Sequence, residues 1–406
     1  MQSQILDQID PQELGQKLQR VRKRQGITQA AAAEILGAAR TTITAIEKGE
    51  RRIKADELRT LAEAYGQSVG NFLSGRPIIE PPAVLFRSDW SKTKTSNALR
   101  SINASVEQLV ELATNYYELE QLTDSIRPHF FLPPYRSNGI SGIEQEAESL
   151  AISERNRLGL GDRPLPPLRS LLEKEAGLRI FYLPLHKSNK FSEIYFYDQT
   201  LGGCIALNQN HESSVGRCRW SLAHAYAHFL AHRQDPVAFA EGISNGRKPE
   251  SEHFADSFAV YFLMPTSRLT QHFTDIYQTK GKVTPPDLVR MANDYGVSFE
   301  AMTRRLEEMK LVPRGLHDRL IDNHKYQPKK AKDELGLADF PEKTEMLSER
   351  YTDLAMQAYA EEKVTETQLA NFLQLDRLDA RDRFYEWKEK AEQTGRDIDI
   401  LQLKAA

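Results

Sequence analysis

The chain of 406 residues has little cysteine and no long hydrophobic run. Its two cysteines, Cys204 and Cys218, cannot supply a disulfide framework, and so few thiols are typical of a reducing compartment. No apolar stretch approaches the roughly 20 residues that a membrane-spanning helix needs. The first residues, MQSQILDQID, are polar and acidic, unlike a signal peptide. We therefore expect a cytoplasmic protein with no membrane partner.

A large excess of charge of one sign is also absent, because the formal net charge is only −3. The charge is unevenly distributed, however. Residues 11–76 hold 12 Lys/Arg and 7 Asp/Glu, an excess of five positive charges that leaves −8 for the remainder. The length suggests two or three domains, each able to bury a core. A small basic module on an acidic remainder indicates nucleic-acid binding at the N-terminal end only.

The basic module shows apolar residues at helical spacing in short blocks. Thr28 is suited to cap a helix that ends at Gly37, and another helix is expected over about 39–48. A helix, a short turn containing glycine and a second helix form the plan of a helix-turn-helix unit.

The string GITQAAAAEILGAARTTITAIEKGERR resembles the XRE, or lambda-repressor-like, DNA-binding domain, which we assign to residues 11–75. The candidate DNA-binding residues are Gln29, Arg40, Thr41, Thr44, Arg51, Arg52 and Lys54. The resemblance implies that the glutamine meets the phosphate backbone and that Arg40, Thr41 and Thr44 face the bases. Arginine can bind guanine bidentately, threonine can contact a thymine methyl, and the later cations can grip phosphate. We expect a homodimer on a double-stranded DNA operator.

Residues 76–140 read as a linker with connector helices, because RPIIEPPAVLFRSDW is rich in proline and a helical stretch follows over about 96–123. That helix is a structural connector or a dimerising helix. Residues 141–270 show a helix, then short β-like runs at 179–183, 193–197 and 204–207, and then further helices. This order predicts an α+β domain.

The run RWSLAHAYAHFLAHR places His224 and His228 four residues apart. On a helix, side chains at this spacing share one face, with about 6 Å between β-carbons, so both imidazoles can reach one ion. His232 lies about 12 Å from His224 along the axis and cannot join them. The third ligand is expected from PESEHFADSFAVYFLMP, where Glu252 fits and Glu250 is a rival. Asp256, one turn after Glu252, is expected in an outer role, holding the other nitrogen of a ligand histidine.

These segments together resemble the ImmA/IrrE family of metallopeptidases, on the strings FSEIYFYDQTLGGCIALN, RWSLAHAYAHFLAHR and EHFADSFAVYFLMP. The resemblance implies a zincin-like fold and a Zn²⁺ ion on His224, His228 and Glu252. It also implies that the chain would cleave a partner protein, a repressor or an antitoxin, in a stress, phage or mobile-element response.

Position 225 departs from the HExxH pattern of that family, because Ala225 stands where the glutamate base is expected. Loss of a positioned general base typically costs about 10² to 10⁴ in rate, so this chain should bind metal and hydrolyse poorly or not at all. Two origins are compatible with the sequence: natural loss, or the laboratory change that inactivates a peptidase. The otherwise intact motif favours the second.

The C-terminal third is expected to be helical, with an extension over 271–315, a polar linker in HKYQPKKAKDEL, and a helical region over 335–400. The last region is a second DNA-reading or sensing module, or a packing helix pair. Two functions follow for the whole chain: a regulatory zinc endopeptidase fused to a DNA-binding domain, or a non-enzymatic repressor whose metal domain senses or scaffolds. In the first, we expect substrate to add as a strand to the sheet edge near Glu193–Tyr197.

Overall fold

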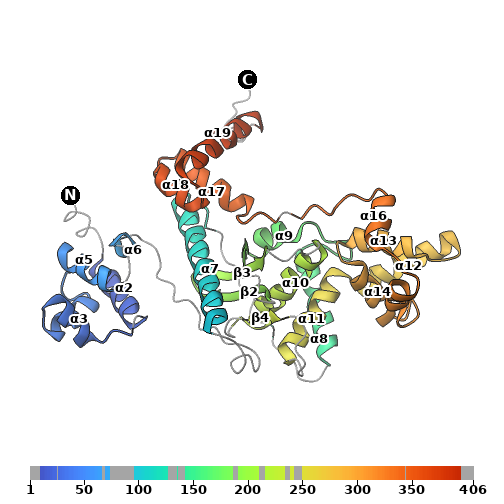
Figure 1. The fold of residues 1–406 in the computed structure, drawn as a ribbon, viewed down its shortest axis with the longest axis horizontal. Helices are drawn as coiled ribbons and strands as arrows, with labels where there is room; N and C mark the ends of the chain where they lie inside the picture. The colour runs from blue at the N-terminus through green and yellow to red at the C-terminus, as the bar shows by residue number, and fades with distance from the viewer. Residues whose placement is uncertain are drawn as a thin grey trace. The chain divides into compact units, whose positions relative to one another are not determined.

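The computed structural model describes residues 10–24, 26–65, 69–73, 96–126, 135, 142–185, 191–209, 215–233, 238–241, 249–342 and 344–394. The chain forms two compact units, Met1–Pro81 and Pro82–Ala406. The first is all-helical, and the second joins an α+β region to a helical C-terminal region (Figure 1). The expected fold class is therefore confirmed. The finer boundaries expected inside the second unit stay predictions.

Within its described residues, the first unit has five short helices: α2 (Pro11–Arg24), α3 (Gln29–Leu36), α4 (Arg40–Glu47), α5 (Ala55–Ala64) and α6 (Val69–Leu73). Thr28 caps α3 by accepting a hydrogen bond from the backbone N–H of Ala31, and Gly37 ends the helix in the left-handed conformation. Gly15 lets α2 approach α4 closely, because a β-carbon there would lie 2.2 Å from the carbonyl oxygen of Ile46. The predicted helix-turn-helix unit, α3 and α4, is present.

A buried ion pair and a hydrogen bond to the same carboxylate join three of these helices. The guanidinium of Arg22 on α2 donates to both carboxylate oxygens of Glu47 at 2.5 and 3.0 Å. The side-chain amide of Gln29 on α3 donates to the same carboxylate at 2.9 Å. Since Glu47 ends α4, this network fixes the angle between the two helices of the motif.

The second unit contains a four-stranded sheet in the order β1-β3-β2-β4, with β1 (Arg179–Leu183), β2 (Phe191–Asp198), β3 (Gly202–Asn208) and β4 (Ala238–Glu241). Strand β3 runs parallel to β1 and antiparallel to β2, which is antiparallel to β4. The three strands expected from the sequence are confirmed. The fourth, from the segment between His228 and Glu252, is not among the predicted strands.

Helices cover both faces of this sheet. Helix α10 (Val215–Ala231) packs on β2 and β3, and α7 (Ser96–Leu122) packs on β1 and β3. Side chains alternate accordingly along the strands. Ile180 and Tyr182 of β1 join the core around α10, whereas Phe181 packs edge-on against Tyr116 of α7. The helix expected as a connector is thus part of the second unit's core.

Helix α11 (Glu250–Leu263) lies between α10 and α8 (Ile143–Arg157), and α9 (Leu168–Glu175) precedes β1. The extension is helical as expected, with α12 (Thr266–Lys280), α13 (Pro285–Tyr295) and α14 (Phe299–Glu308), then α15 (Leu316–Asp318) and a π-helical turn over Arg319–Asn323. The polar linker was predicted wrongly in part. Residues Pro328–Glu334 form α16, which starts with proline and packs on α13.

A C-terminal group of helices, α17 (Glu349–Ala360), α18 (Glu366–Leu373) and α19 (Arg377–Thr394), is tied to the sheet by the preceding segment. The carboxylate of Glu342 is fully buried, where Arg219 of α10 donates to it at 2.9 Å and the first backbone N–H groups of α9 donate at 2.8 and 3.0 Å. The backbone N–H of Tyr182 then donates to the carbonyl of Met346 at 3.2 Å. This segment therefore covers the β1 edge at that point.

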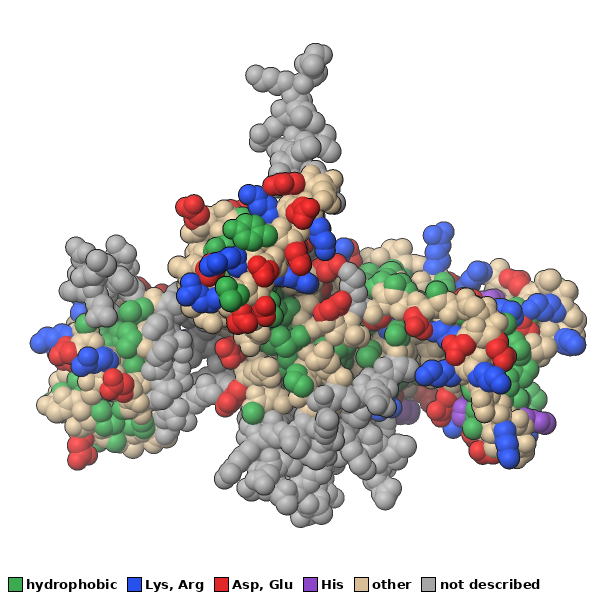
Figure 2. Space-filling view, turned by 45° about the horizontal axis from the view of Figure 1, so that its top comes forward, with side chains coloured by type: hydrophobic (Ala, Val, Ile, Leu, Met, Phe, Trp, Pro, Cys, Tyr) green, Lys and Arg blue, Asp and Glu red, His purple; other side chains and the backbone are tan. Residues whose placement is uncertain are grey.

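Acidic and basic side chains intermix on the face over these C-terminal helices (Figure 2). This mixture does not single out a DNA-binding surface there. Among the described residues, no helix combines the length and apolarity that crossing a membrane requires.

Candidate metal centre

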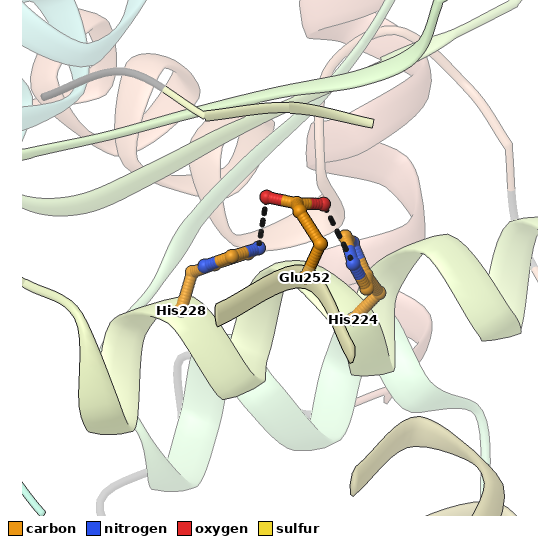
Figure 3. Close-up of side chains that lie close together, drawn as sticks. All are labelled: His224, His228 and Glu252. Atoms are coloured by element: carbon orange, nitrogen blue, oxygen red, sulfur yellow. Dashed lines mark ion pairs between the residues drawn. The ribbon is translucent and has the colours of Figure 1, made fainter. Parts of the chain in front are cut away.

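The two histidines of α10 converge with a glutamate of α11 (Figure 3). Nε2 of His224 lies 3.5 Å from Oε2 of Glu252, and Nε2 of His228 lies 3.5 Å from Oε1 of the same carboxylate. Candidate ligand atoms of all three residues lie within 4.8 Å of one another. Both histidines are 1% exposed. The residues expected as ligands thus surround one buried point.

Glu193 of β2 supports the first histidine from behind, and sequence reasoning did not assign it a role. Nδ1 of His224 and Oε1 of Glu193 are 2.5 Å apart, and both side chains are buried. A carboxylate there fixes the imidazole so that Nε2 points at the other two ligands. The alternation of side chains along β2 could have indicated Glu193, because Glu193 and Tyr195 share the face on which α10 packs. Tyr195 also stacks with His228.

Burial and the neighbouring Glu193 carboxylate shift the pKa of the His224 imidazole in opposite directions. Burial lowers the pKa of His224, but the Glu193 carboxylate and then Glu252 raise it, with a net result of about 10. Burial also raises the pKa of Glu193. Without a cation at Nε2, the protein therefore stabilises a proton on this histidine. A metal ion can replace that proton, since metal ligation requires the unprotonated ring nitrogen.

The outer role expected for Asp256 is not seen at His224. Glu193 holds Nδ1, whereas Oδ1 of Asp256 lies 3.5 Å from Nε2, the nitrogen that faces the ligands. At His224 that position is taken by Glu193, which the sheet brings in and which spacing along one helix does not indicate. The outer role of Asp256 at a ligand histidine otherwise stays a prediction. The rival ligand Glu250 stands in the first turn of α11, is exposed, and is not part of the cluster.

Ala225 is fully buried in the core around α10 and carries no proton acceptor. The expected substrate edge was placed wrongly, because β2 lies between β3 and β4 and is not an edge. The reason is the unpredicted strand β4, whose backbone takes the pairing positions beside Phe191–Tyr195. Among the described strands, β4 is the edge on this side of the sheet.

The candidate DNA-binding residues occupy different environments in the first unit. Arg40 and Thr41 are exposed on α4, and Arg52 and Lys54 are exposed after it. Thr44 is half-buried, and its hydroxyl lies 3.4 Å from the side-chain oxygen of Gln29.

Two of the candidate DNA-binding residues already have hydrogen-bond partners inside the first unit. The Gln29 amide donates to Glu47, so this side chain already has an internal partner. Arg51 donates to both carboxylate oxygens of Glu57 at 3.1 and 2.8 Å, which compensates its charge. Arg40 and Thr41 therefore stay the strongest base-reading candidates, and Arg52 and Lys54 the strongest phosphate-binding ones.

Comparison with known proteins agrees with both units. Residues 13–71 match a family described as a helix-turn-helix domain, and residues 173–307 match the Peptidase_M78 family, described as an IrrE N-terminal-like domain. A crystal structure of Bacillus thuringiensis PlcR in complex with the peptide PapR7 and DNA is similar over 96% of this chain and 99% of that chain. It shares 10% identity at a TM-score of 0.17, too low to support any argument. No curated protein matches the chain.

The fold and the matched regions define a helix-turn-helix protein with a peptidase-like second region. More specifically, the chain joins a helix-turn-helix domain to an IrrE N-terminal-like domain of the M78 peptidase type. The cluster lies within the matched region and fits a metal ion. The buried Nε2 of His224 has no hydrogen-bond partner among the described residues, and two histidines with one glutamate are a common zinc-binding set.

Proposed function

We propose that this protein is a cytoplasmic transcriptional regulator that binds a DNA operator as a homodimer and engages a partner protein through its IrrE-like domain. The convergence of His224, His228 and Glu252 inside the matched domain carries the proposal. The helix-turn-helix match and the exposed residues of α4 support DNA as the other partner. The protein partner we expect is a repressor or an antitoxin.

In this proposal His224, His228 and Glu252 hold Zn²⁺, and Glu193 orients His224. When bound, zinc acts as a Lewis acid that polarises a peptide carbonyl and acidifies water. The side chain at position 225 would have to take a proton from that water and pass one to the leaving amine. Ala225 can do neither, so this chain binds its partner protein without turning it over.

The test is to replace Ala225 by glutamate and to measure cleavage of the true partner. We expect Ala225→Glu to raise cleavage by about 10²-fold or more, and zinc chelation to remove the gain. Ala225→Gln is the matched control, because it has similar size and no carboxylate. A glutamate variant that binds zinc and partner normally yet never cuts would disprove the peptidase proposal.

Ala225 itself favours a second candidate function, a non-enzymatic repressor whose metal domain senses or scaffolds. The missing base is the observation behind it. Under this function, operator binding would change with zinc occupancy or with partner binding, and Ala225→Glu would create no hydrolysis. Operator affinity measured with and without zinc separates the two.

A further inference from the structure

The last two helices expose three large apolar side chains near one another in the sequence. Leu375, in the turn between α18 and α19, is 42% exposed, and Leu378 and Tyr385 of α19 are 67% and 61% exposed. Figure 2 shows hydrophobic side chains at the surface of this C-terminal group. Single exposed apolar residues are common, but several together mark a surface that contacts another molecule.

The turn before α19 is held in place, so this exposure is part of the fold. Gln374 ends α18 in the left-handed conformation, with a φ of 56°. The carboxylate of Asp376 then accepts hydrogen bonds at 2.9 Å from the backbone N–H groups of Leu378 and Asp379, which caps α19. Leu375 stands between these two fixed points.

Leu375 also lines a groove of about 490 Å³, which is within the size range of ligand pockets. The apolar lining comes from the end of α18, the turn after it and the segment before α17, and it consists of Leu373, Leu375, Met346 and Leu347. The segment before α17 is fixed, because Arg169 of α9 donates to the backbone carbonyls of Glu345 and Met346 at 2.6 and 3.3 Å. The groove is therefore formed before any partner binds.

A second hollow of about 470 Å³ adjoins this groove. The two have five lining residues in common: Glu345, Leu347, Thr352, Arg383 and Glu386. Together they give room for a chain segment longer than a single side chain or ion.

The charged lining of the groove is acidic. It has four carboxylates and one arginine: Glu345, Asp379, Asp382, Glu386 and Arg383. Arg383 lies 3.8 Å from Glu386. Among the described residues, the other three carboxylates have no lysine or arginine partner. The pKa of Asp379 is raised, first by the neighbouring Asp376 carboxylate and also by Asp382. A cation from outside would relieve this repulsion.

We propose that this groove docks a partner protein through a basic amphipathic segment. A large apolar side chain of that segment covers Leu373 and Leu375, and its lysines or arginines face the carboxylates. The combination of apolar floor and acidic rim selects this chemistry, because a purely polar cation leaves the leucines uncovered and an uncharged segment leaves the carboxylates unpaired. The same rim repels nucleic acid. The surface is separate from the candidate metal ligands, which belong to α10 and α11, and the inference does not depend on them.

Peptide binding to the full chain, measured by fluorescence anisotropy, tests the chemistry of the partner. The probe is a labelled peptide of leucine and lysine in which the leucines share one helix face. We expect it to bind, and a serine–lysine peptide of equal charge to bind at least about 10-fold more weakly, because it has no large apolar side chain to bury. A leucine–glutamate peptide should not bind. No binding of the leucine–lysine peptide, or equal binding of the serine–lysine peptide, would overturn the proposal.

Substitutions locate the binding surface. Leu375→Ser should weaken binding of the leucine–lysine peptide by about 10-fold. The double change Asp379→Asn with Asp382→Asn should weaken it by about 3- to 30-fold, as expected for two exposed ion pairs. All three residues are exposed, so the fold tolerates these changes. Asp275→Asn with Asp322→Asn removes the same charge from exposed positions outside the groove and is the matched control.

Equal circular dichroism of all chains checks folding. Parent-like affinity in the groove variants, or the same loss in the control, would place peptide binding elsewhere and overturn the proposal. Sedimentation detects the other occupant, a second copy of this chain. A parent chain that self-associates and a Leu375→Ser chain that does not would assign the groove to that contact instead.

Discussion

At the scale of single residues, Glu193 is the side chain whose importance sequence reasoning missed. It lies 31 positions before His224, and no helical spacing relates the two. Only the packing of α10 on β2 brings their side chains together. Glu193 is thus a positioning residue of the candidate centre, because it contacts the candidate ligand His224.

We predict that Glu193→Gln weakens zinc binding by about 10- to 100-fold, the usual effect of losing such a support. An amide retains the size but not the charge that stabilises the imidazole orientation. Competition against a chelator measures the change, and Glu193→Asp should recover part of the affinity. Glu175→Gln, an exposed change at the end of α9, serves as the control. Equal affinities for Glu193→Gln and the control would remove Glu193 from the centre.

At the scale of elements, α4 presents its exposed residues as a recognition helix requires. We predict that Arg40→Ala weakens specific operator binding by about 1–3 kcal/mol with little effect on random DNA. Arg52→Ala should weaken binding to every sequence and reduce the salt slope by about one. Affinity measured on both DNAs across a salt series checks this. Equal losses on both DNAs for Arg40→Ala would mean that another element reads the bases.

The same experiment has an internal comparison in Arg51. Because Glu57 compensates its guanidinium, Arg51→Ala should change the salt slope by less than the full unit expected for loss of one phosphate contact.

The Arg22–Glu47 pair predicts a pH dependence for the packing of α2, α3 and α4. Burial raises the pKa of Glu47, but hydrogen bonds from Arg22, Gln29 and Gln19 lower it, and the net direction is down. A carboxyl whose pKa is lowered on folding contributes stability above its unfolded pKa of about 4.3, and this is lost as pH falls through the folded value.

We therefore predict that amide protection in α2–α4 declines below about pH 4.3 in the parent chain. Glu47→Gln should reduce protection already at pH 7, by about 3–5 kcal/mol, because it leaves Arg22 buried without its countercharge. Hydrogen exchange followed by mass spectrometry reads these helices within the full chain. Glu63→Gln, an exposed change on α5, is the control. Parent-like protection in Glu47→Gln would show that the pair does not hold the motif together.

At the scale of the whole molecule, the proposed zinc belongs to the second unit, because all candidate ligands lie in it. We predict about one zinc per chain although Ala225 is present, since none of the three ligands is the missing residue. Zinc in 100-fold excess over its Kd should stabilise this unit by about 2.7 kcal/mol. Elemental analysis and hydrogen exchange of α10 and α11, with and without chelator, check this.

The double variant His224→Ala with His228→Ala should lose both the zinc and the stabilisation. Amide hydrogen exchange in α4 should not respond to zinc, either in the parent chain or in the double variant. A folded parent chain that contains no zinc even after loading would contradict the proposed centre.

The sequence by itself determined most of the local structure. Thr28 and Gly37 mark the ends of α3, and the runs at 179–183, 193–197 and 204–207 are strands. These features depend on a few neighbouring residues, through capping, glycine conformation and side-chain period. The histidine spacing likewise predicted two side chains on one helix face, because that follows from helix geometry alone.

Only the tertiary structure decided what lies beside those elements. Strand β4 has a weak local signal and forms where β2 offers its backbone, and its pairing removes the expected substrate edge. Glu193, and not Asp256, lies against Nδ1 of His224, because the packing of α10 on the sheet brings it there. Such contacts depend on how distant segments pack, and the spacing of residues along one chain segment carries no information about them.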